Sequence, residues 1–185
     1  MRTFIAIELP ETVKVALCEL SERLRHVPVR ASWAKPEAMH LTLRFLGDLE
    51  SGKLAPLFEN LAAEYSGTRP FELKVRSTGA FPNLRHPSVL WVGVEPPDGP
   101  LATVQNVAEQ AARAIGLSAE KNRFHPHVTI ARIKDEAGSN RLVSLLLKEK
   151  EFEGGAFPVN GVSLFSSQLT PHGPIHQRLK EFPFQ

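Results

Sequence analysis

The pattern His-x-Thr occurs twice in the sequence, and both copies lie where apolar and polar residues alternate. His40 and Thr42 belong to the first copy, and His127 and Thr129 to the second. Successive side chains of a strand point to opposite faces, so each copy predicts a strand with its histidine and threonine on one face. Two such strands, nearly half a chain apart and each flanked by helical patterns, indicate a duplicated unit.

Strand and helix patterns follow one another in a similar order in the two halves. Strands are expected over residues 2–9, 31–34, 39–46, 71–77, 89–94, 127–133, 157–166 and 175–182. Helices are expected from residue 10 or 11, over 52–65, over 101–115 and over 140–150. This order favours an α+β protein, one domain over residues 1–185, whose antiparallel sheets face each other across a cleft. The Pro- and Gly-rich residues 96–100 are the expected junction between the two halves.

Composition narrows the class of protein further. The chain of 185 residues is 42% hydrophobic and 23% charged, and no apolar run approaches the roughly 18 to 20 residues that span a bilayer. Cys18 is the only cysteine, which excludes an internal disulfide and a multi-cysteine zinc site. Without a signal-peptide pattern or a coiled-coil heptad, we expect a cytoplasmic monomer that does not bind membranes. A net charge of +2 gives no signature of tight, non-specific binding to duplexes.

The two motifs combine groups suited to acid–base chemistry. Along one strand face, each imidazole lies roughly 7 Å from its threonine hydroxyl. Imidazole has an unperturbed pKa of about 6.5, so one histidine can accept a proton near neutral pH while the other donates one. Hydrolysis of a cyclic phosphodiester needs both steps, and the threonines can donate hydrogen bonds to the phosphate oxygens. A single His-x-Thr is more often a structural feature of a strand, but two copies favour a catalytic pair.

The local settings of the motifs, with further segments, carry a resemblance to a known family. These segments are residues 39–47 (MHLTLRFLG), 123–132 (RFHPHVTIAR), 2–7 (RTFIAI), 79–83 (GAFPN), 89–94 (VLWVGV) and 173–174 (GP). On them, the chain resembles the two-histidine phosphoesterases, specifically the bacterial and archaeal RNA 2',3'-cyclic phosphodiesterases of the 2'-5' RNA ligase family. The similarity covers nearly the whole chain.

The resemblance implies a bilobal fold with pseudo-twofold symmetry, with helices outside and both motifs in a central cleft. It implies hydrolysis of RNA 2',3'-cyclic phosphate ends to 2'-phosphomonoesters, and reversible joining of RNA through 2'-5' linkages. RNA ends, including tRNA-like fragments, are the expected partner, and no cofactor or metal is expected. We assign His40 as the acid on the leaving oxygen and His127 as the base on water, although the sequence does not break the symmetry between them.

Four further residues are candidates for substrate binding. Arg44 has the parity of His40 in its strand, so its guanidinium is expected to face the phosphate. Arg132 leaves the opposite face of its strand from Thr129 unless a bulge intervenes, and it is otherwise a surface residue. Phe81 and Phe124 are candidates to stack on a base, although phenylalanine is more often part of a core.

Other positions are ambiguous. Ser88 stands where the family often has arginine, and Arg85 nearby is more simply a solvated loop residue. His176 stands where relatives often have tyrosine, and we assign it no role. His125 and His127 form a His-Pro-His pair that suggests a metal, but the sequence offers no third ligand close by.

Two alternatives remain open. The first alternative to an RNA 2',3'-cyclic phosphodiesterase is a two-histidine phosphoesterase that acts on another small cyclic or 2'-5' nucleotide. The second is a non-catalytic module that binds RNA ends and uses the histidines only as phosphate ligands. Measuring activity on such nucleotides would distinguish the first alternative from an RNA phosphodiesterase. Binding of RNA ends without turnover would support the second alternative.

Overall fold

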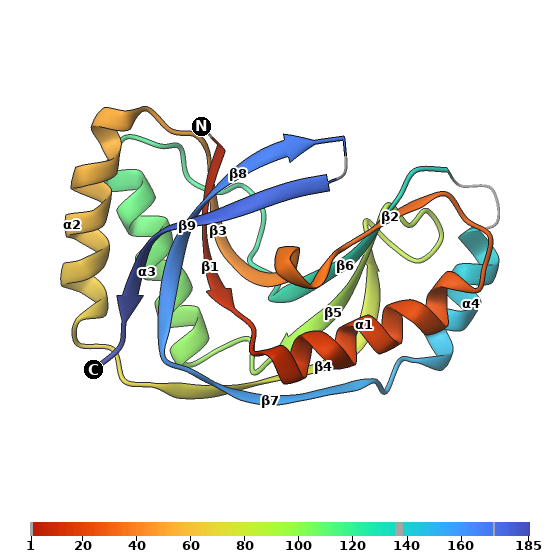
Figure 1. Ribbon diagram of the computed structural model, residues 1–185. Helices are drawn as coiled ribbons and strands as arrows, with labels where there is room; N and C mark the ends of the chain where they lie inside the picture. Colours follow the sequence, from red (N-terminus) through yellow and green to blue (C-terminus); the bar gives the residue numbers. More distant parts are fainter. Residues whose placement is uncertain (1, 136–138, 172) are drawn as a thin grey trace.

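The computed structural model describes residues 2–135, 139–171 and 173–185 (Figure 1). Within these ranges the helices are α1 (Glu11–Arg25), α2 (Leu54–Tyr65), α3 (Pro100–Ala114) and α4 (Ser139–Lys148), with short 3-10 turns η1 (Pro36–Ala38) and η2 (Ser51–Lys53). The strands are β1 (Arg2–Glu8), β2 (Ala31–Trp33), β3 (His40–Asp48), β4 (Phe71–Phe81), β5 (Val89–Glu95), β6 (His127–Ile133), β7 (Glu153–Val159), β8 (Gly161–Thr170) and β9 (Gly173–Pro183). The α+β class predicted from the sequence is confirmed.

The strands form two antiparallel sheets whose orders correspond. Sheet A has the order β3-β1-β8-β9, and sheet B has the order β2-β6-β5-β4-β7. Each motif strand thus pairs with a neighbour in its sheet, β3 with β1 in sheet A and β6 with β5 in sheet B. Beyond these neighbours lie β8, beside β1, and β4, beside β5. Each sheet therefore contains strands from before and from after residues 96–100, and the position of the junction at these residues stays a prediction.

The helices likewise come from both parts of the chain, and they cover the outer faces of the sheets (Figure 1). Helices α2 and α3 pack on each other and on β9 and β3 of sheet A, whereas α1 and α4 pack on β6, β7 and β4 of sheet B. Leu17 and Leu20 of α1, like Leu57 and Leu61 of α2, have no exposed surface. Burial of these apolar stripes is the main force that holds each helix to its sheet.

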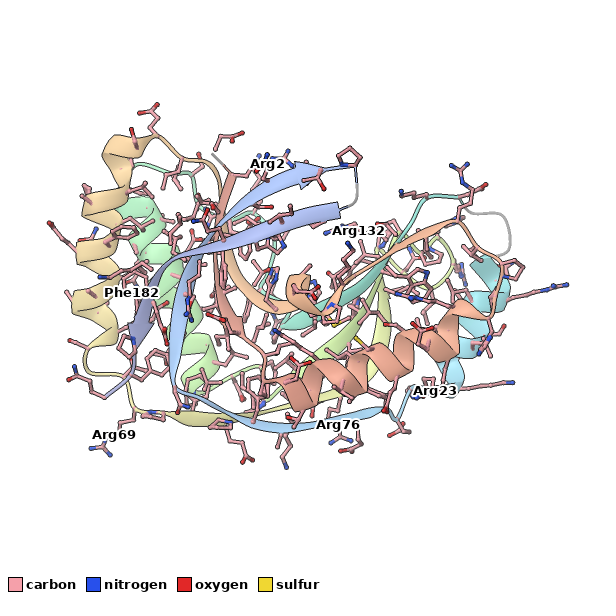
Figure 2. All side chains as sticks on the ribbon, in the orientation of Figure 1. Arg2, Arg23, Arg69, Arg76, Arg132 and Phe182 are labelled. Carbon is pink, nitrogen blue, oxygen red and sulfur yellow. The ribbon has the colours of Figure 1, made fainter. Side chains whose placement is uncertain are left out.

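Side chains fill the space between helices and sheets in both lobes, as Figure 2 shows. Phe182 of β9 is 2% exposed, whereas Arg23, Arg69 and Arg76 point outward from the molecule (Figure 2). Arg23 forms an ion pair with Glu149 at 2.8 Å, which ties α1 to the segment after α4. In the described part of the chain, no helix is both long and apolar enough to cross a membrane.

Each motif strand contains a β-bulge directly after its threonine. In β3, Ile5 of β1 faces Arg44 and the next residue, Ala6, faces Thr42, so Leu43 is the extra residue. In β6, Leu90 of β5 faces Ala131 and the next residue, Trp91, faces Thr129, so the extra residue lies between them. A bulge reverses the parity of the side chains that follow it.

The sequence failed to predict where the strands near the C-terminus divide. One strand was expected over residues 157–166, but β7 ends at Val159 and β8 begins at Gly161. β7 pairs with β4 in sheet B, and β8 pairs with β1 in sheet A. The apolar pattern runs on across Asn160 while the chain changes sheets there. A Cβ at Gly161 would lie 2.7 Å from the Phe182 carbonyl oxygen, so the turn needs glycine.

Candidate active site

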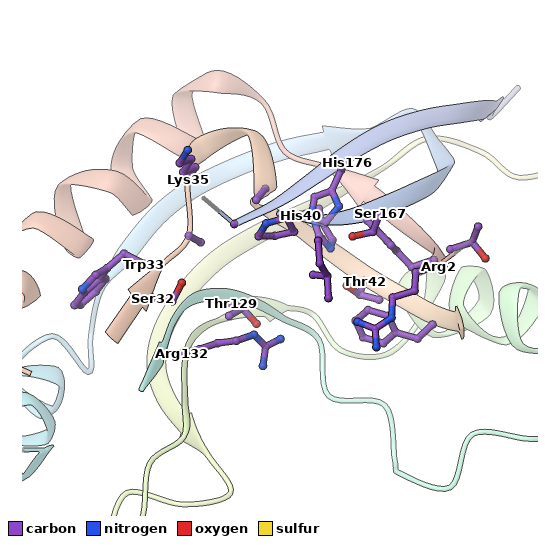
Figure 3. A pocket seen from close by; sticks show the side chains of 18 of the residues that line it. Arg2, Ser32, Trp33, Lys35, His40, Thr42, Thr129, Arg132, Ser167 and His176 are labelled. Atoms are coloured by element: carbon purple, nitrogen blue, oxygen red, sulfur yellow. The ribbon is translucent and has the colours of Figure 1, made fainter. Parts of the chain in front are cut away.

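A cavity of about 610 Å³ lies between the two sheets and brings both motifs together. His40 and Thr42 of β3 line it on one side, and His127 and Thr129 of β6 line it on the other (Figure 3 labels three of the four). All four side chains are partly exposed. The expected cleft, with polar strand faces directed into it, is therefore present.

His40 is packed between aromatic rings. The Phe4 ring is stacked on it with centroids 4.6 Å apart, and the His176 ring meets it edge-on at 5.2 Å. A hydrogen bond with the backbone of Ala38 holds the imidazole. Burial, and secondarily the charge of protonated His176, lower the pKa of His40 to about 4. The His40 imidazole is therefore neutral near pH 7.

His127 is fixed in a related way. Its Nδ1 lies 2.6 Å from the His125 carbonyl oxygen, and because a carbonyl only accepts, Nδ1 donates and Nε2 is left as the acceptor of the neutral ring. The Phe81 ring meets it edge-on at 4.9 Å. Burial lowers the pKa of His127, and the hydrogen bond to His125 opposes that shift. The pKa of His127 is lowered less than that of His40, so His127 is the easier of the two to protonate.

Arg44 does not lie where its parity predicted. Its side chain is 9% exposed and faces away from the cavity, where Nε forms an ion pair with Glu109 at 2.5 Å and Nη1 one with Glu120 at 3.4 Å. Its guanidinium also donates to the carbonyl oxygens of Phe45, at 2.6 Å, and Ser118, at 2.5 Å. The bulge at Leu43 turns Arg44 to the helix-covered face, so the expectation of a phosphate-facing Arg44 is wrong.

The same kind of bulge places Arg132 in the cavity. Arg132 is exposed and lines the cavity (Figure 3), as expected only for a strand with a bulge. Phe45 occupies the corresponding place on β3, is 58% exposed and also lines the cavity. The sequence did not single out Phe45, because strict alternation puts it on the opposite face from His40.

The two candidate stacking residues lie outside the cavity wall. Phe81 contacts the ring of Trp91, with centroids 5.2 Å apart, as well as those of His125 and His127. Phe81 thus packs against the His127 ring without lining the cavity. Phe124 is partly buried and packs against the hydrophobic core. Neither ring is among the side chains that line the cavity, so the expectation that they stack on a base is not supported.

The ambiguous loop positions have structural contacts. The Ser88 hydroxyl donates to the Phe81 carbonyl oxygen at 3.1 Å, and Arg85 lines a shallow second hollow together with Trp91. Among the residues described, no group of three or more His, Cys, Asp or Glu side chains is arranged to hold a metal ion. The His125–His127 pair thus has no third ligand within the described part of the chain.

The sequence model of the LigT-like phosphoesterase family matches this chain twice, at residues 7–91 and 92–176. The chain belongs to the LigT-like phosphoesterase family. Each matched segment contains one of the two His-x-Thr motifs.

Among curated relatives, the chain is similar to three proteins named RNA 2',3'-cyclic phosphodiesterase. It is 31% identical to that of Methanothermobacter thermautotrophicus over 182 residues, 98% of each chain. It is 36% identical to that of Aeropyrum pernix over 165 residues, 89% of this chain and 93% of the relative. It is 34% identical to that of Thermotoga maritima over 185 residues, 100% of this chain and 96% of the relative.

Solved structures agree with the fold. TT0787 of Thermus thermophilus matches with a TM-score of 0.78 and 30% identity, over 100% of this chain and 98% of the other. LigT of E. coli complexed with 3'-AMP matches with a TM-score of 0.79 and 23% identity, over 99% of this chain and 97% of the other.

In this LigT-like phosphoesterase, the cavity wall also contains residues that the sequence did not single out. The cations Arg2 and Lys35 line it together with Arg132, and the aromatic Phe4 lines it beside Phe45. Among the described residues of the wall no side chain is acidic. A cationic cavity with two lowered-pKa histidines suits an anionic, phosphate-containing substrate. Alternation alone could have indicated Arg2, which lies two positions before Phe4 in β1.

Proposed function

We propose that this LigT-like phosphoesterase hydrolyses RNA 2',3'-cyclic phosphate ends to 2'-phosphomonoesters by acid–base catalysis with His40 and His127. One observation carries the proposal: both imidazoles, each hydrogen-bonded to a backbone two residues earlier in the chain, line the same cationic cavity. The names of the curated relatives support the choice of RNA 2',3'-cyclic phosphates as substrate.

The reaction needs one proton accepted and one donated. A water oxygen forms the new bond to phosphorus while its proton passes to one imidazole. The bond from phosphorus to O3' breaks as the other imidazolium gives its proton to O3', and the 2'-phosphomonoester remains. This scheme requires no cofactor. Two histidines on facing sheets suit the opposite sides of such an in-line displacement.

The lowered pKa values support the reverse of the order assigned from the sequence. A bound anionic phosphate raises the pKa of both imidazoles, and His127 reaches the protonated state first because its pKa is lowered less. We therefore assign His127 as the acid on O3' and His40 as the base on water. The ribose then lies on the side of sheet B.

The two threonines stabilise charge on the reacting phosphate. The Thr42 and Thr129 hydroxyls face the cavity from both sheets and donate to the two non-bridging oxygens, whose charge grows as phosphorus becomes five-coordinate. Arg132 adds a cation on the side of sheet B, and Phe45 an apolar surface on the side of sheet A. Reversal of the reaction, with an RNA 5'-hydroxyl replacing water, joins RNA through a 2'-5' linkage. We propose that the protein acts as a cytoplasmic monomer.

The test is turnover of a short RNA that ends in a 2',3'-cyclic phosphate, with excess chelator, by wild type, His40→Ala and His127→Ala. Each variant should lose about a hundredfold or more in kcat, as expected for the loss of an acid or a base. The product of the wild type should be a 2'-phosphate. His26→Ala, at the exposed C-terminal end of α1, is the matched control and should keep full activity.

Different outcomes separate the alternatives. Loss of activity in chelator, or near-normal turnover by either variant, would remove the two-histidine mechanism. Faster turnover of another cyclic or 2'-5' nucleotide would replace RNA as the substrate. Tight RNA binding without turnover would support a binding module.

A further inference from the structure

Among the described residues, strand β2 has no counterpart in sheet A, and it makes the two sides of the cavity unequal. Sheet A ends at its motif strand β3, whereas sheet B continues past its motif strand β6 to β2. β2 and the residues after it contribute Ser32, Trp33 and Lys35 to the cavity wall. In Figure 3 these three residues follow one another on the opposite side of the cavity from Arg2 and Ser167.

Ser32 and Arg132 lie directly opposite each other in the pairing of β2 with β6. Opposed residues of an antiparallel pair share a face, with their Cβ atoms about 5 Å apart. Both side chains are exposed and line the cavity. A hydroxyl beside a guanidinium, which presents five N–H donors, is a combination that suits the oxygens of a phosphate.

Lys35 adds a second cation from the connection between the sheets. It immediately precedes η1 (Pro36–Ala38), and the backbone of Ala38 holds the imidazole of His40. The segment that carries Lys35 thus runs from β2 to the catalytic strand of sheet A. Lys35 is exposed and lines the cavity, and Glu37, the nearest carboxylate along the chain, is not part of the wall.

Backbone hydrogen bonds and a cation–π contact hold this edge of sheet B in place. The Ala34 amide donates to the Ile130 carbonyl oxygen at 2.9 Å, and the Lys134 amide donates to that of Arg30 at 2.8 Å. The Arg25 guanidinium lies 5.3 Å from the centre of the Trp33 ring and covers one side of it. Groups fixed before binding lose less conformational entropy when a ligand arrives.

We propose that Ser32, Lys35 and Arg132 form a second phosphate subsite, which binds the phosphodiester on the 5' side of the nucleotide that carries the cyclic phosphate. This inference rests on the proposed function, which places the cyclic phosphate between β3 and β6. Because β2 flanks β6 in sheet B, an RNA chain that leaves the cavity along sheet B passes these three side chains. The subsite makes the enzyme prefer substrates with this second phosphate over a nucleoside 2',3'-cyclic phosphate.

Three substrates isolate the second phosphate: a nucleoside 2',3'-cyclic phosphate, the same compound with a 5'-phosphate, and a dinucleotide ending in the cyclic phosphate. For wild type, kcat/KM should be about tenfold higher for the second and third, as expected for charge-assisted contacts to one phosphate. Lys35→Met should lose most of this preference, with kcat/KM falling much more for the second and third substrates than for the first. Lys35→Arg should keep the preference.

Salt dependence gives a second readout. For the dinucleotide, the slope of log(kcat/KM) against log salt concentration should be shallower by about 0.7 in Lys35→Met, as expected when one contact to single-stranded phosphate is lost. Lys148→Met removes the same charge from the exposed end of α4 and should match wild type in both measurements.

Two results would overturn the subsite. One is a wild type that shows no preference for a second phosphate, and the other is an equal loss for all three substrates in Lys35→Met, which would place Lys35 at the reacting phosphate. Failure of the proposed function is distinct, because the wild type would then turn over none of the three. Thermal melting of Lys35→Met confirms that the fold is kept.

Discussion

The two lobes use one strand plan and the same bulge, yet they present different side chains to the cavity. After the bulge, β3 buries Arg44 and exposes Phe45, whereas β6 buries Ala131 and exposes Arg132. The bulge shifts one residue of each pair behind the sheet and the next one into the cavity. A duplicated backbone thus gives a site with an aromatic ring on one side and a cation on the other.

The two histidines also occupy equivalent positions but have different neighbours. His40 is enclosed by the rings of Phe4 and His176, whereas His127 has Phe81 at its edge and the His125 carbonyl at 2.6 Å. Burial lowers both pKa values, but more strongly for His40. Equivalent positions are therefore made unequal by their neighbours, which is what an acid–base pair requires.

Paired threonine substitutions test how equivalent the lobes are in the reaction, and we expect the largest effect here. Thr42→Val and Thr129→Val each keep the strand shape and remove one hydroxyl donor from the cavity. Each should lower kcat by about a hundredfold, as the loss of one transition-state donor does. Single-turnover rates with saturating cyclic phosphate measure this loss.

Thr103→Val, at an exposed position in the first turn of α3, is the matched control and should leave kcat unchanged. If one of the two motif variants kept wild-type kcat, only one threonine would contact the phosphate in the transition state. The two lobes would then not act equivalently on the phosphate.

Arg44→Met tests whether Arg44, which the bulge in β3 turns away from the cavity, stabilises the fold rather than contacting the substrate. Loss of the guanidinium leaves Glu109, whose side chain is 19% exposed, without its partner, and should destabilise the fold by about 3 kcal/mol. Because Arg44 also donates to the Phe45 carbonyl oxygen, kcat/KM should fall by about tenfold. Urea unfolding and turnover at low temperature measure the two effects.

The double variant Arg44→Met with Glu109→Gln should recover part of the lost stability, since the half-buried, unpaired carboxylate is then gone. If Arg44→Met instead raised KM while kcat and the free energy of unfolding stayed unchanged, Arg44 would contact the substrate directly.

The sequence predicted the motif strands, the helices and the meeting of the histidines because these depend on apolar periodicity and on the repeat. It could not predict the faces of Arg44 and Phe45, since a bulge is set by pairing with β1 and leaves no mark on the pattern of one strand. The burial of Phe124 and the split at Asn160 likewise depend on which distant element the chain meets.

His176→Gln is expected to have the smallest effect, and it concerns only the His40 side. As the base, His40 must be neutral, so kcat/KM falls as the pH drops through its pKa of about 4. His127 as the acid must be protonated, so kcat/KM also falls as the pH rises through its pKa, which lies below the usual value. Burial lowers the pKa of His176 as well, but below that pKa its positive charge opposes protonation of His40.

Removing that charge should raise the pKa of His40 and move the acidic limb of the kcat/KM profile to higher pH, with the basic limb unmoved. His26→Gln, a remote and exposed change, should leave both limbs in place. A shift of the basic limb instead would mean that His40 has the higher pKa of the pair. The order of acid and base that distinguishes the two lobes would then have to be reversed.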